Sequence, residues 1–536
     1  MAQPSSVLDG FWLPAGLRHL TRDAEWEVAV PAGRPAAPEP GVAVRWPRLN
    51  REQWQRLLRE LQAARGPRSA GLVLRWQKAL AAVPRLLANQ PATLQAVADY
   101  SGYPLSMLLL AFAQGELVRL DDLACALGTS PTWQAARDWR PMLGGLPGYL
   151  RFFPSRAAER WEAALRGHQP LYRPLPPATF ALGFAAGNVP GNGLLAALLL
   201  HIANHTALDA RDPLPPAVLV RVSRQAPLLD PWVLTAIERV DPELVQGLAL
   251  LVWDYADEDL QRMLFGQADL ALAAASDQTI AALDAQIHAT GRPVRFLRHG
   301  HKVSFSAVGR GALHDDPTRP ARLAAVDSTL WDQYGCLSAR VHFVEHGSRH
   351  GVTDYAACLR DAMRDLARRL PRGPAPRRFL HQAFDTYKQA EAWGDVQLLT
   401  TYDDDCLVVV DGRPWSREQW HATVNRCTGR VVVVRPVDDL RAVPAQYLRQ
   451  IPAANLQSMS IAVEPERALE LAEGAGRCGV TALRSLGHAA FPQLAYSWDG
   501  LLPLDLGNRR PAGHFTTLET EDPLADIAPT LARLGF

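Results

Sequence analysis

One cysteine has neighbours suited to nucleophilic chemistry. Cys336 lies in the segment 331–338 (Trp-Asp-Gln-Tyr-Gly-Cys-Leu-Ser), after a predicted helical stretch and before the predicted strand Arg340–Glu345. A thiol at such a junction can be presented to a cleft and activated there as a nucleophile. The alternative is that a cysteine is a small buried hydrophobic residue. The flanking residues favour the nucleophile for Cys336, and packing is the expected role of the other five cysteines.

A glycine-rich turn is the second candidate. Residues 187–193 (Gly-Asn-Val-Pro-Gly-Asn-Gly) follow the apolar run Phe180–Ala186 and precede a helical stretch over Leu194–Asn204. Backbone N–H groups at a helix start, together with a side-chain amide, can stabilise a developing negative charge. The turn lacks the Gly-Lys-Ser/Thr of a phosphate-binding P-loop and the G-x-G-x-x-G spacing. A purely structural turn is the alternative.

Two histidine pairs have spacings that resemble metal-ligand motifs, but we expect a metal at neither pair. His342 and His346 fit H-x-x-E-H, but their neighbours predict a strand, in which the two rings would lie about 13 Å apart. His201 and His205 share a predicted helix face without an evident third ligand. The sequence therefore predicts no metal site.

The helices and strands that must position these residues are predicted to form an α/β fold. From about residue 178, continuous apolar runs alternate with helical patterns, which is typical of parallel strands buried on both faces. We expect strands over Ala217–Val222, Gln246–Trp253 and Leu270–Ala275, and helices over Asp230–Val240 and Gln278–His288. A doubly wound sheet of this kind binds ligands at the carboxyl ends of its strands.

The expected domain organisation follows these changes of pattern. Residues 1–50 are predicted to form an N-terminal arm with short strands. Residues 51–298 are predicted to be a helical region and a cofactor-binding domain, which about 436–490 completes. Residues 299–435 would form a catalytic domain carrying Cys336, and 491–536 a C-terminal segment. Within 51–165, Pro91 is expected to open a helix and Pro104–Gln114 to form another, but these helical patterns give no indication of chemistry. By its composition, the stretch 370–378 is expected to be a surface loop.

Composition excludes several classes of protein. The 536 residues include 56 basic and 55 acidic side chains, a net charge of +1 that does not favour nucleic-acid binding. Only Lys78, Lys302 and Lys388 are lysines, so a lysine-dependent site has few candidates. The six scattered cysteines argue against a disulfide framework. No secretory signal or apolar run long enough to span a bilayer is visible, so we expect a soluble, cytoplasmic protein.

Several segments together resemble a known family. In consistent order over about residues 180–505, they are similar to the acyl-CoA reductase of the bacterial bioluminescence type, a fatty acid reductase branch of the aldehyde dehydrogenase superfamily. The Cys336 segment is the most specific of them. The segments are 187–191, 218–223, 268–280, 301–305, 332–338, 344–347, 456–458 and 498–500.

The resemblance implies an aldehyde-dehydrogenase-like fold and a chemistry. Cys336 would attack an acyl thioester, and the Asn188 amide would stabilise the oxyanion. The resulting acyl-enzyme would be reduced by NADPH to a free aldehyde. Hydrolytic aldehyde dehydrogenases carry a glutamate at the start of the segment that here is 298–302, but no acidic residue occurs from Gly291 to His314. Because a base that activates water is missing there, the acyl-enzyme should survive to meet hydride or a thiol.

The cofactor residues implied by the resemblance depart from the usual pattern. Where the superfamily usually has a lysine at the end of the second strand, this chain has Arg221, followed by Ser223 and Arg224. Both arginines could bind a 2′-phosphate in bidentate fashion, which would favour NADPH, and a solvated arginine is the alternative. Ser276 is expected to cap the next helix, where the neighbouring Asp277 is an awkward residue for a pyrophosphate.

Three functions remain open at this point. The first is NADPH-dependent reduction of an acyl-CoA or acyl carrier protein thioester, with a long acyl chain. The second is a CoA-acylating aldehyde dehydrogenase that runs in the oxidative direction. The third is a non-catalytic partner-binding protein on the same fold. A homo-oligomer is expected, and an acyl-activating protein partner is possible.

Overall fold

The computed structural model describes most of the chain. The described residues are 6–30, 42–66, 72–108, 139–141, 148–152, 172–174, 177–204, 214–489, 498–500, 509–511 and 514–518. The chain forms two compact units. The first contains residues 1–127, 172–301 and 503–510, and the second contains 128–171, 302–502 and 511–536.

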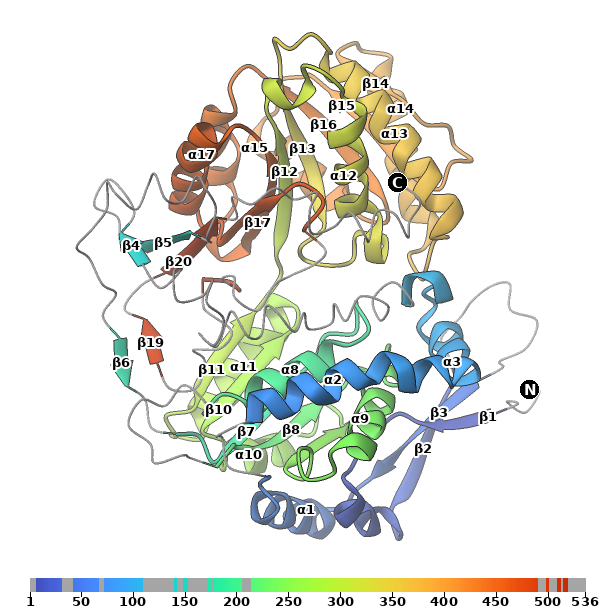
Figure 1. The fold of residues 1–536 in the computed structure, drawn as a ribbon, viewed down its shortest axis with the longest axis vertical. Coiled ribbons are helices and arrows are strands. Elements are labelled where there is room, and N and C mark those ends of the chain that lie inside the picture. The colour runs from blue at the N-terminus through green and yellow to red at the C-terminus, as the bar shows by residue number, and fades with distance from the viewer. Residues whose placement is uncertain are drawn as a thin grey trace. The chain divides into compact units, whose positions relative to one another are not determined.

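The first unit is built on a five-stranded parallel sheet (Figure 1). Its strands are β7 (Phe180–Phe184), β8 (Ala217–Arg221), β9 (Leu248–Leu251), β10 (Leu270–Ala274) and β11 (Arg295–His299). The first strand in sequence, β7, lies in the middle, with β8 and β9 on one side and β10 and β11 on the other. This order places a topological switch point between β7 and β10, where dinucleotides bind in doubly wound sheets. The predicted doubly wound sheet is confirmed.

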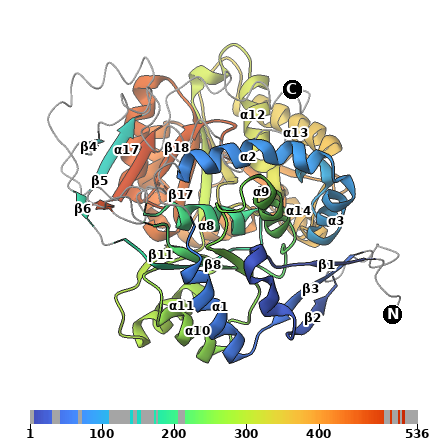
Figure 2. The same cartoon turned by 60° about the horizontal axis from the view of Figure 1, so that its bottom comes forward.

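Helices cover both faces of this sheet (Figure 2). One face carries α8, α9 and α2, and the other carries α1, α10 and α11. The bounds are α1 (Arg51–Ala63), α2 (Leu72–Ala88), α3 (Pro91–Ser101), α8 (Asn192–His201), α9 (Leu229–Val240), α10 (Glu258–Phe265) and α11 (Asp277–Ala289).

Helix α1 shows why these segments are helical. Asn50 and Gln53 form a reciprocal capping box at its start, and the four apolar residues at helical spacing all face the core. Those four buried residues are Trp54, Leu57, Leu58 and Leu61.

The N-terminal residues form a small sheet in the order β1-β3-β2 (Ser6–Asp9, Val42–Arg48 and Glu25–Ala29), with a 3-10 helix over Ala15–Thr21. The helix expected to open at Pro91 is α3, with the proline in its first turn. The helix expected from Pro104 to Gln114 is described only as far as residue 108. Strands β6 (Tyr172–Pro174) and β19 (Arg509–Pro511) pair with each other.

The second unit contains a ten-stranded, mostly parallel sheet in the order β14-β15-β16-β13-β12-β17-β18-β20-β5-β4. Its strands are β12 (Val303–Val308), β13 (Ala339–Glu345), β14 (Val396–Leu398), β15 (Leu407–Asp411), β16 (Val431–Val437), β17 (Leu456–Ala462), β18 (Ala482–Ser485), β20 (His514–Leu518), β5 (Gly148–Phe152) and β4 (Trp139–Pro141).

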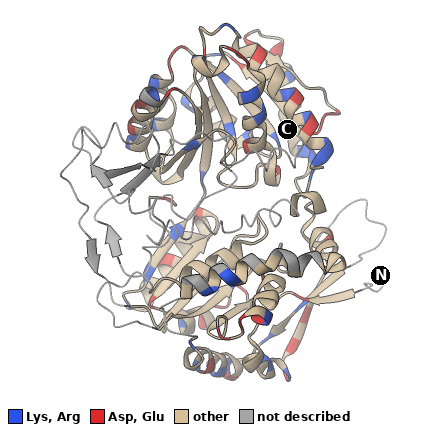
Figure 3. Ribbon diagram, in the orientation of Figure 1, with Lys and Arg blue, Asp and Glu red and all other residues tan. Residues whose placement is uncertain are grey.

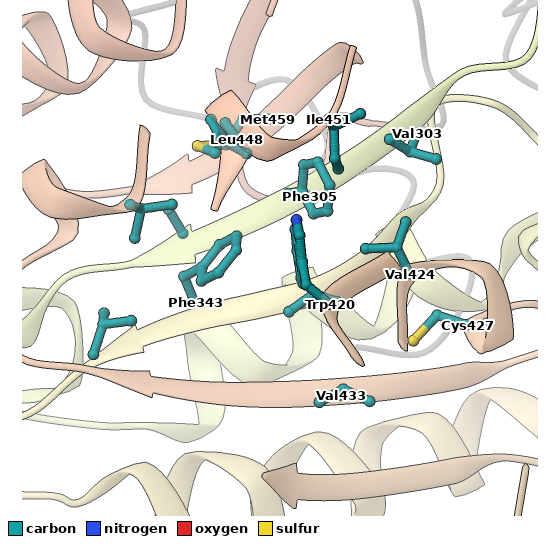
Figure 4. Packing of buried hydrophobic residues seen from close by; sticks show 14 of the residues in the cluster. Val303, Phe305, Phe343, Trp420, Val424, Cys427, Val433, Leu448, Ile451 and Met459 are labelled. Carbon is teal, nitrogen blue, oxygen red and sulfur yellow. The ribbon is translucent and has the colours of Figure 1, made fainter. Parts of the chain in front are cut away.

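Helices also cover both faces of the larger sheet. Helices α14, α15 and α17 share one buried cluster with the strands, and α12 and α13 pack on the opposite face. In that cluster Phe305, Phe343 and Trp420 lie together, with 5.6 Å between the ring centroids of Phe305 and Trp420 (Figure 4). The helices are α12 (Thr318–Thr329), α13 (Val352–Arg369), α14 (Arg377–Glu391), α15 (Arg417–Arg426), α16 (Val443–Gln446) and α17 (Pro465–Cys478), with short 3-10 helices at Arg310–Leu313, Leu330–Gln333, Leu440–Ala442, Leu448–Gln450 and Ala453–Asn455.

Two expectations from the sequence differ from the structure. Residues 436–490 were expected to complete the cofactor-binding region, but β17 and β18 pair with β12 and each other in the second unit's sheet. Buried apolar strands have similar sequences in either sheet, so their sequence does not indicate which sheet they join. Residues 370–378, expected to be a surface loop, include the buried Leu370 and Ala375. Side-chain hydrogen bonds described below hold that loop inward.

Charged residues of both signs are interspersed along the outer helices of the second unit, as α13 shows (Figure 3). Several of them pair with each other, for example Arg368 with Asp365. Among the described residues, no helix combines the length and apolarity that crossing a bilayer requires.

Candidate active site

The turn before Cys336 has a rare backbone conformation. Trp331, Asp332 and Gln333 all have positive φ angles, of 54°, 51° and 59°. For residues with a β-carbon the left-handed conformation costs about 1–2 kcal/mol each, and three in succession occur only where the surroundings enforce them. A helical segment was predicted before Cys336. Helix α12 fulfils this, and a left-handed turn follows it.

Asp332 is the residue that fixes this turn. Its carboxylate is fully buried and accepts from Arg430 Nε at 2.9 Å and from the backbone N–H of Gly373 at 2.8 Å. Its carbonyl oxygen accepts from the backbone N–H of Gly429 at 3.0 Å. The Arg430 side chain is itself fully buried and also donates to the carbonyl oxygens of Leu370 and Pro371. These bonds offset the backbone cost of the turn.

Gln333 holds the turn against the sheet. Its Nε2 donates to the carbonyl oxygens of Ala339 on β13 and Val431 on β16, at 2.8 and 3.0 Å. Its Oε1 accepts from the backbone N–H of Val431 at 2.8 Å. The turn that presents Cys336 is therefore attached to two central strands.

The backbone of Cys336 is held from a third strand. Its carbonyl oxygen accepts from Ser304 Oγ at 2.8 Å, and Ser458 Oγ donates to Ser304 Oγ at 2.9 Å. Ser304 lies where the register of β12 shifts, and Ser458 lies on the neighbouring β17. Cys336 as a residue is partly exposed, and these bonds fix its backbone.

The thiol lies among buried charged and polar groups. Burial, followed by the Asp499 carboxylate, raises the pKa of the Cys336 thiol to about 11. The side chains of Gln457 and Arg484 lower this pKa in part. Lys302 Nζ lies 3.7 Å from the Asp499 carboxylate, and the two side chains are 10% and 4% exposed. A thiol with a pKa near 11 is expected to be mostly protonated at neutral pH before a substrate binds.

This raised pKa predicts the pH dependence of Cys336 alkylation. Because the thiolate is the nucleophile, the iodoacetamide rate constant should rise about tenfold per pH unit from pH 7 towards the pKa near 11. Peptide-resolved mass spectrometry over pH 7–11 measures this rate. A rate that levels off below pH 9 would show that the thiol is activated without substrate.

In the first unit, the predicted glycine-rich turn connects β7 to α8. The carbonyl oxygen of Asn188 accepts from Tyr103 OH at 2.6 Å, and its side-chain Oδ1 accepts from Asn192 Nδ2 at 3.3 Å. The second bond orients the Asn188 amide with its oxygen towards Asn192. Gly187 allows the turn to approach the next loop, because a β-carbon there would lie 2.2 Å from Ser223 Oγ.

A buried carboxyl supports the same turn. Asp230, in the first turn of α9, accepts from the backbone N–H of Gly193 at 3.1 Å. Burial raises the pKa of Asp230 to about 7, although the N–H groups of Gly193 and Leu194 act against this rise. A carboxyl that is partly protonated at neutral pH repels an anion at the start of α8 less than a full charge would.

The arginine that ends β8 is engaged inside its unit. Arg221 is buried, its Nε donates to the carbonyl oxygen of Trp253 at 2.7 Å, and its guanidinium carbon lies 3.6 Å from the centre of the Tyr255 ring. Burial lowers the pKa of Arg221, but an arginine with these partners stays charged. Its guanidinium therefore packs as a cation–π pair instead of projecting into solvent.

Ser223 and Arg224 lie beyond the end of the same strand. Ser223 Oγ accepts from the backbone N–H of Gln225 at 3.2 Å. Arg224 is exposed, lies 3.5 Å from the Glu27 carboxylate, and accepts a hydrogen bond from Tyr100 OH at its carbonyl oxygen. Of the two arginines expected to bind a 2′-phosphate, Arg224 is exposed and Arg221 is buried.

Ser276 caps α11 as predicted, since its Oγ accepts from the backbone N–H of Thr279 at 3.2 Å. The neighbouring Asp277 accepts at Oδ1 from the backbone N–H of His301 at 2.7 Å. An acidic side chain therefore does approach the segment 298–302, from a helix outside the acid-free stretch. This bond directs the Asp277 carboxylate towards the backbone of the loop that contains His301.

The histidine considered for a metal has other partners. His342 lies on β13, the predicted strand, and bonds Ser328 Oγ at 2.8 Å and Tyr355 OH at 3.0 Å. Burial lowers the pKa of His342 to about 3, so the ring is neutral. It connects β13 to α12 and α13.

Sequence reasoning missed several residues that support these groups. Tyr103 comes from the helical region judged uninformative, and Asp230 and Arg430 are far in sequence from the groups they bind. Asp332 and Gln457 lay within segments already singled out, but nothing local distinguished them from packing residues.

The fold is similar to that of aldehyde dehydrogenases. It is similar to aldehyde dehydrogenase 21 from Physcomitrella patens, solved with the product succinate, with 12% identity over 95% of each chain and a TM-score of 0.60. Lactaldehyde dehydrogenase from Escherichia coli gives 14% identity over 95% of this chain and 96% of that one, with a TM-score of 0.56. A Δ-pyrroline-5-carboxylate dehydrogenase from Mycobacterium tuberculosis, solved with NAD and cobalamin bound, is 14% identical in sequence. The match covers 95% of this chain and 90% of that one, with a TM-score of 0.58.

Within that fold class the chain is assigned more narrowly by its sequence. The family described as acyl-CoA reductase (LuxC) matches residues 172–506. The chain belongs to this family, as the resemblance indicated, and is an oxidoreductase of acyl or aldehyde groups. No curated protein matches the chain.

Proposed function

We propose that this protein reduces an acyl thioester to an aldehyde through a covalent acyl-enzyme at Cys336, with NADPH as the reductant. The observation that carries the proposal is the left-handed turn over residues 331–333, which strands β12, β13 and β16 hold in place beside a partly exposed cysteine. Backbone strain of this kind concentrates at functional sites. Family membership supports the acyl thioester as the substrate.

In this proposal the chain supplies position and charge stabilisation. Cys336 loses its proton, and its sulfur forms a bond to the acyl carbon as the bond to the carrier thiol breaks. The exchange of one thioester for another is nearly isoenergetic, so orientation and oxyanion stabilisation carry the rate. Asn188 is the proposed oxyanion donor, and Asn192 orients its amide.

The first unit suits a nicotinamide dinucleotide. Its strand order creates a switch point between β7 and β10, and α8 and α11 begin at the carboxyl ends of those strands. The proposed contacts are Arg221, Ser223, Arg224 and Ser276, and the Arg221 guanidinium is held over the Tyr255 ring. The bound dinucleotide would supply a hydride. An exposed arginine just beyond the end of β8, such as Arg224, could bind a 2′-phosphate, which would favour NADPH over NADH.

The direct test is aldehyde formation from defined thioesters. Protein, NADPH and either a long-chain acyl-CoA or acyl carrier protein are combined, and the loss of reduced-nicotinamide absorbance is followed. Consumption of NADPH with stoichiometric aldehyde supports the proposal. If a folded protein consumes NADPH with neither donor yet oxidises aldehyde in the presence of CoA, the function is CoA-acylating oxidation instead.

Asn188→Ala tests the oxyanion assignment. Removal of one such donor is expected to lower kcat by about 10²–10³-fold, with a smaller change in KM, because the bond strengthens only as the oxyanion develops. Steady-state kinetics with acyl-CoA measure both constants. The alkylation rate of Cys336 is the control and should not change. An unchanged kcat would remove Asn188 from the mechanism.

The remaining assignments are also proposals. We propose a cytoplasmic homo-oligomer that receives its acyl group from CoA or carrier protein, with an acyl-activating protein as a further partner. Comparison of the two donors, and sedimentation of the purified protein, would test these assignments.

A further inference from the structure

Gln457 has a buried side-chain amide, and the proposed mechanism assigns no role to this amide. It lies on β17, and its side chain is only 2% exposed. Neither its Nε2 nor its Oε1 makes a hydrogen bond of ordinary geometry within the part of the chain that the structure describes. A buried amide in that state costs about 1–3 kcal/mol, so its presence needs an explanation.

Backbone and neighbouring contacts fix the place of Gln457 on its strand. The carbonyl oxygen of Gln457 accepts from the backbone N–H and the hydroxyl of Thr481, at 2.8 and 3.0 Å. The next residue, Ser458, is linked through Ser304 to the carbonyl oxygen of Cys336. The strand that carries Gln457 and the loop that carries Cys336 are therefore held together, independently of the amide itself.

The Cys336 sulfur is the reacting atom within reach of the amide. Burial and the Asp499 carboxylate raise the pKa of this thiol, and among the groups that lower it the Gln457 side chain has the largest effect. A neutral thiol is a weak acceptor, whereas hydrogen bonds to an ionised group are about twice as strong as neutral ones. The contact should therefore strengthen when Cys336 loses its proton.

We propose that Gln457 is a catalytic hydrogen-bond donor, whose Nε2–H binds the Cys336 thiolate before acyl transfer and again when the acyl-enzyme breaks down. The second half of this role rests on the proposed function. In the first step the thiol proton passes to solvent, the sulfur lone pair forms the bond to the acyl carbon, and the carrier sulfur leaves with its bonding pair and takes a proton from solvent. When the acyl-enzyme is reduced with the proposed NADPH, the carbon–sulfur bond breaks and its electron pair returns to Cys336 Sγ.

Gln457→Met tests the donor while keeping nearly the same volume. The iodoacetamide alkylation of Cys336 is measured by peptide-resolved mass spectrometry from pH 7 to pH 11. Cys358 on α13, also partly exposed, serves as the internal control thiol. A lost bond to a charged group should slow Cys336 alkylation about 10- to 100-fold at pH 8, with no change at Cys358. Because both pKa values lie at or above the wild-type value near 11, the two Cys336 profiles should run parallel from pH 7 to pH 10, each rising about tenfold per pH unit.

A second variant keeps the inference testable if Gln457→Met does not fold. Gln457→Asn retains the amide but withdraws it by one methylene, so it should also slow Cys336 alkylation and shift the profile to higher pH. An unchanged profile in a folded Met or Asn variant, as judged by thermal unfolding, would show that Gln457 only fills space and would overturn the inference.

The two proposals fail separately. If the wild-type protein makes no aldehyde from any thioester while Gln457→Met still slows Cys336 alkylation, the proposed reductase function is wrong. The proposal that Gln457 donates a hydrogen bond to the Cys336 thiolate is then retained. If aldehyde is made and the alkylation profile of the variant equals that of the wild type, the function stands and the role of Gln457 is wrong.

Discussion

Cys336→Ala is expected to keep the fold and to lose aldehyde formation by about 10³–10⁶-fold, the range seen when an enzyme loses its nucleophile. The reason is that no acyl-enzyme can form at this position without the sulfur. The small change from a thiol to a methyl group at a partly exposed site should alter thermal stability little. NADPH consumption with a long-chain acyl-CoA measures the loss.

Cys358→Ala is the matched control for this prediction. Cys358 is also a partly exposed, free cysteine of the second unit, and its sulfur lies 3.8 Å from Thr318 Oγ1 on α12. Its removal should leave aldehyde formation within about twofold of wild type. Equal activity in Cys336→Ala and Cys358→Ala would mean that the reaction does not pass through Cys336.

Arg430→Met is expected to destabilise the second unit by about 3–5 kcal/mol, because it leaves the fully buried Asp332 carboxylate without its charge partner. For a unit of this size the thermal unfolding midpoint should fall by roughly 6–20 °C. The variant should also relax the left-handed turn before Cys336, so its aldehyde formation should fall even at temperatures where it stays folded.

An exposed pair provides the comparison for Arg430. Arg368 pairs with Asp365 on α13, and the Arg368 side chain is 73% exposed. Arg368→Met should cost at most about 1 kcal/mol, because solvent screens such a pair. If differential scanning calorimetry finds the same midpoint for both variants, the buried pair does not hold the turn in the manner described.

The sequence was sufficient to predict the sheet of the first unit because its strands are continuous apolar runs and its helices have clear periodicity. The strand over residues 217–221 and the capping role of Ser276 could be recognised from neighbouring residues alone. The position of Cys336 between a helix and β13 was likewise a local inference.

What could not be predicted depends on residues far apart in the chain. Arg430 lies 98 positions from Asp332, and three consecutive left-handed residues without glycine have no sequence signal. The raised pKa of Cys336 arises from burial and from Asp499, which folding brings to the thiol. The orientation of Arg221 likewise depends on Trp253 and Tyr255, which lie beyond the next strand.

Intact-protein mass spectrometry after incubation with a long-chain acyl-CoA, in the absence of NADPH, tests the central claim most directly. We predict the added mass of one acyl group, located on the peptide that contains Cys336, absent from Cys336→Ala and removed when NADPH is supplied. A folded protein that acquires no acyl group, or that carries it on another residue, would contradict the covalent mechanism proposed for this enzyme.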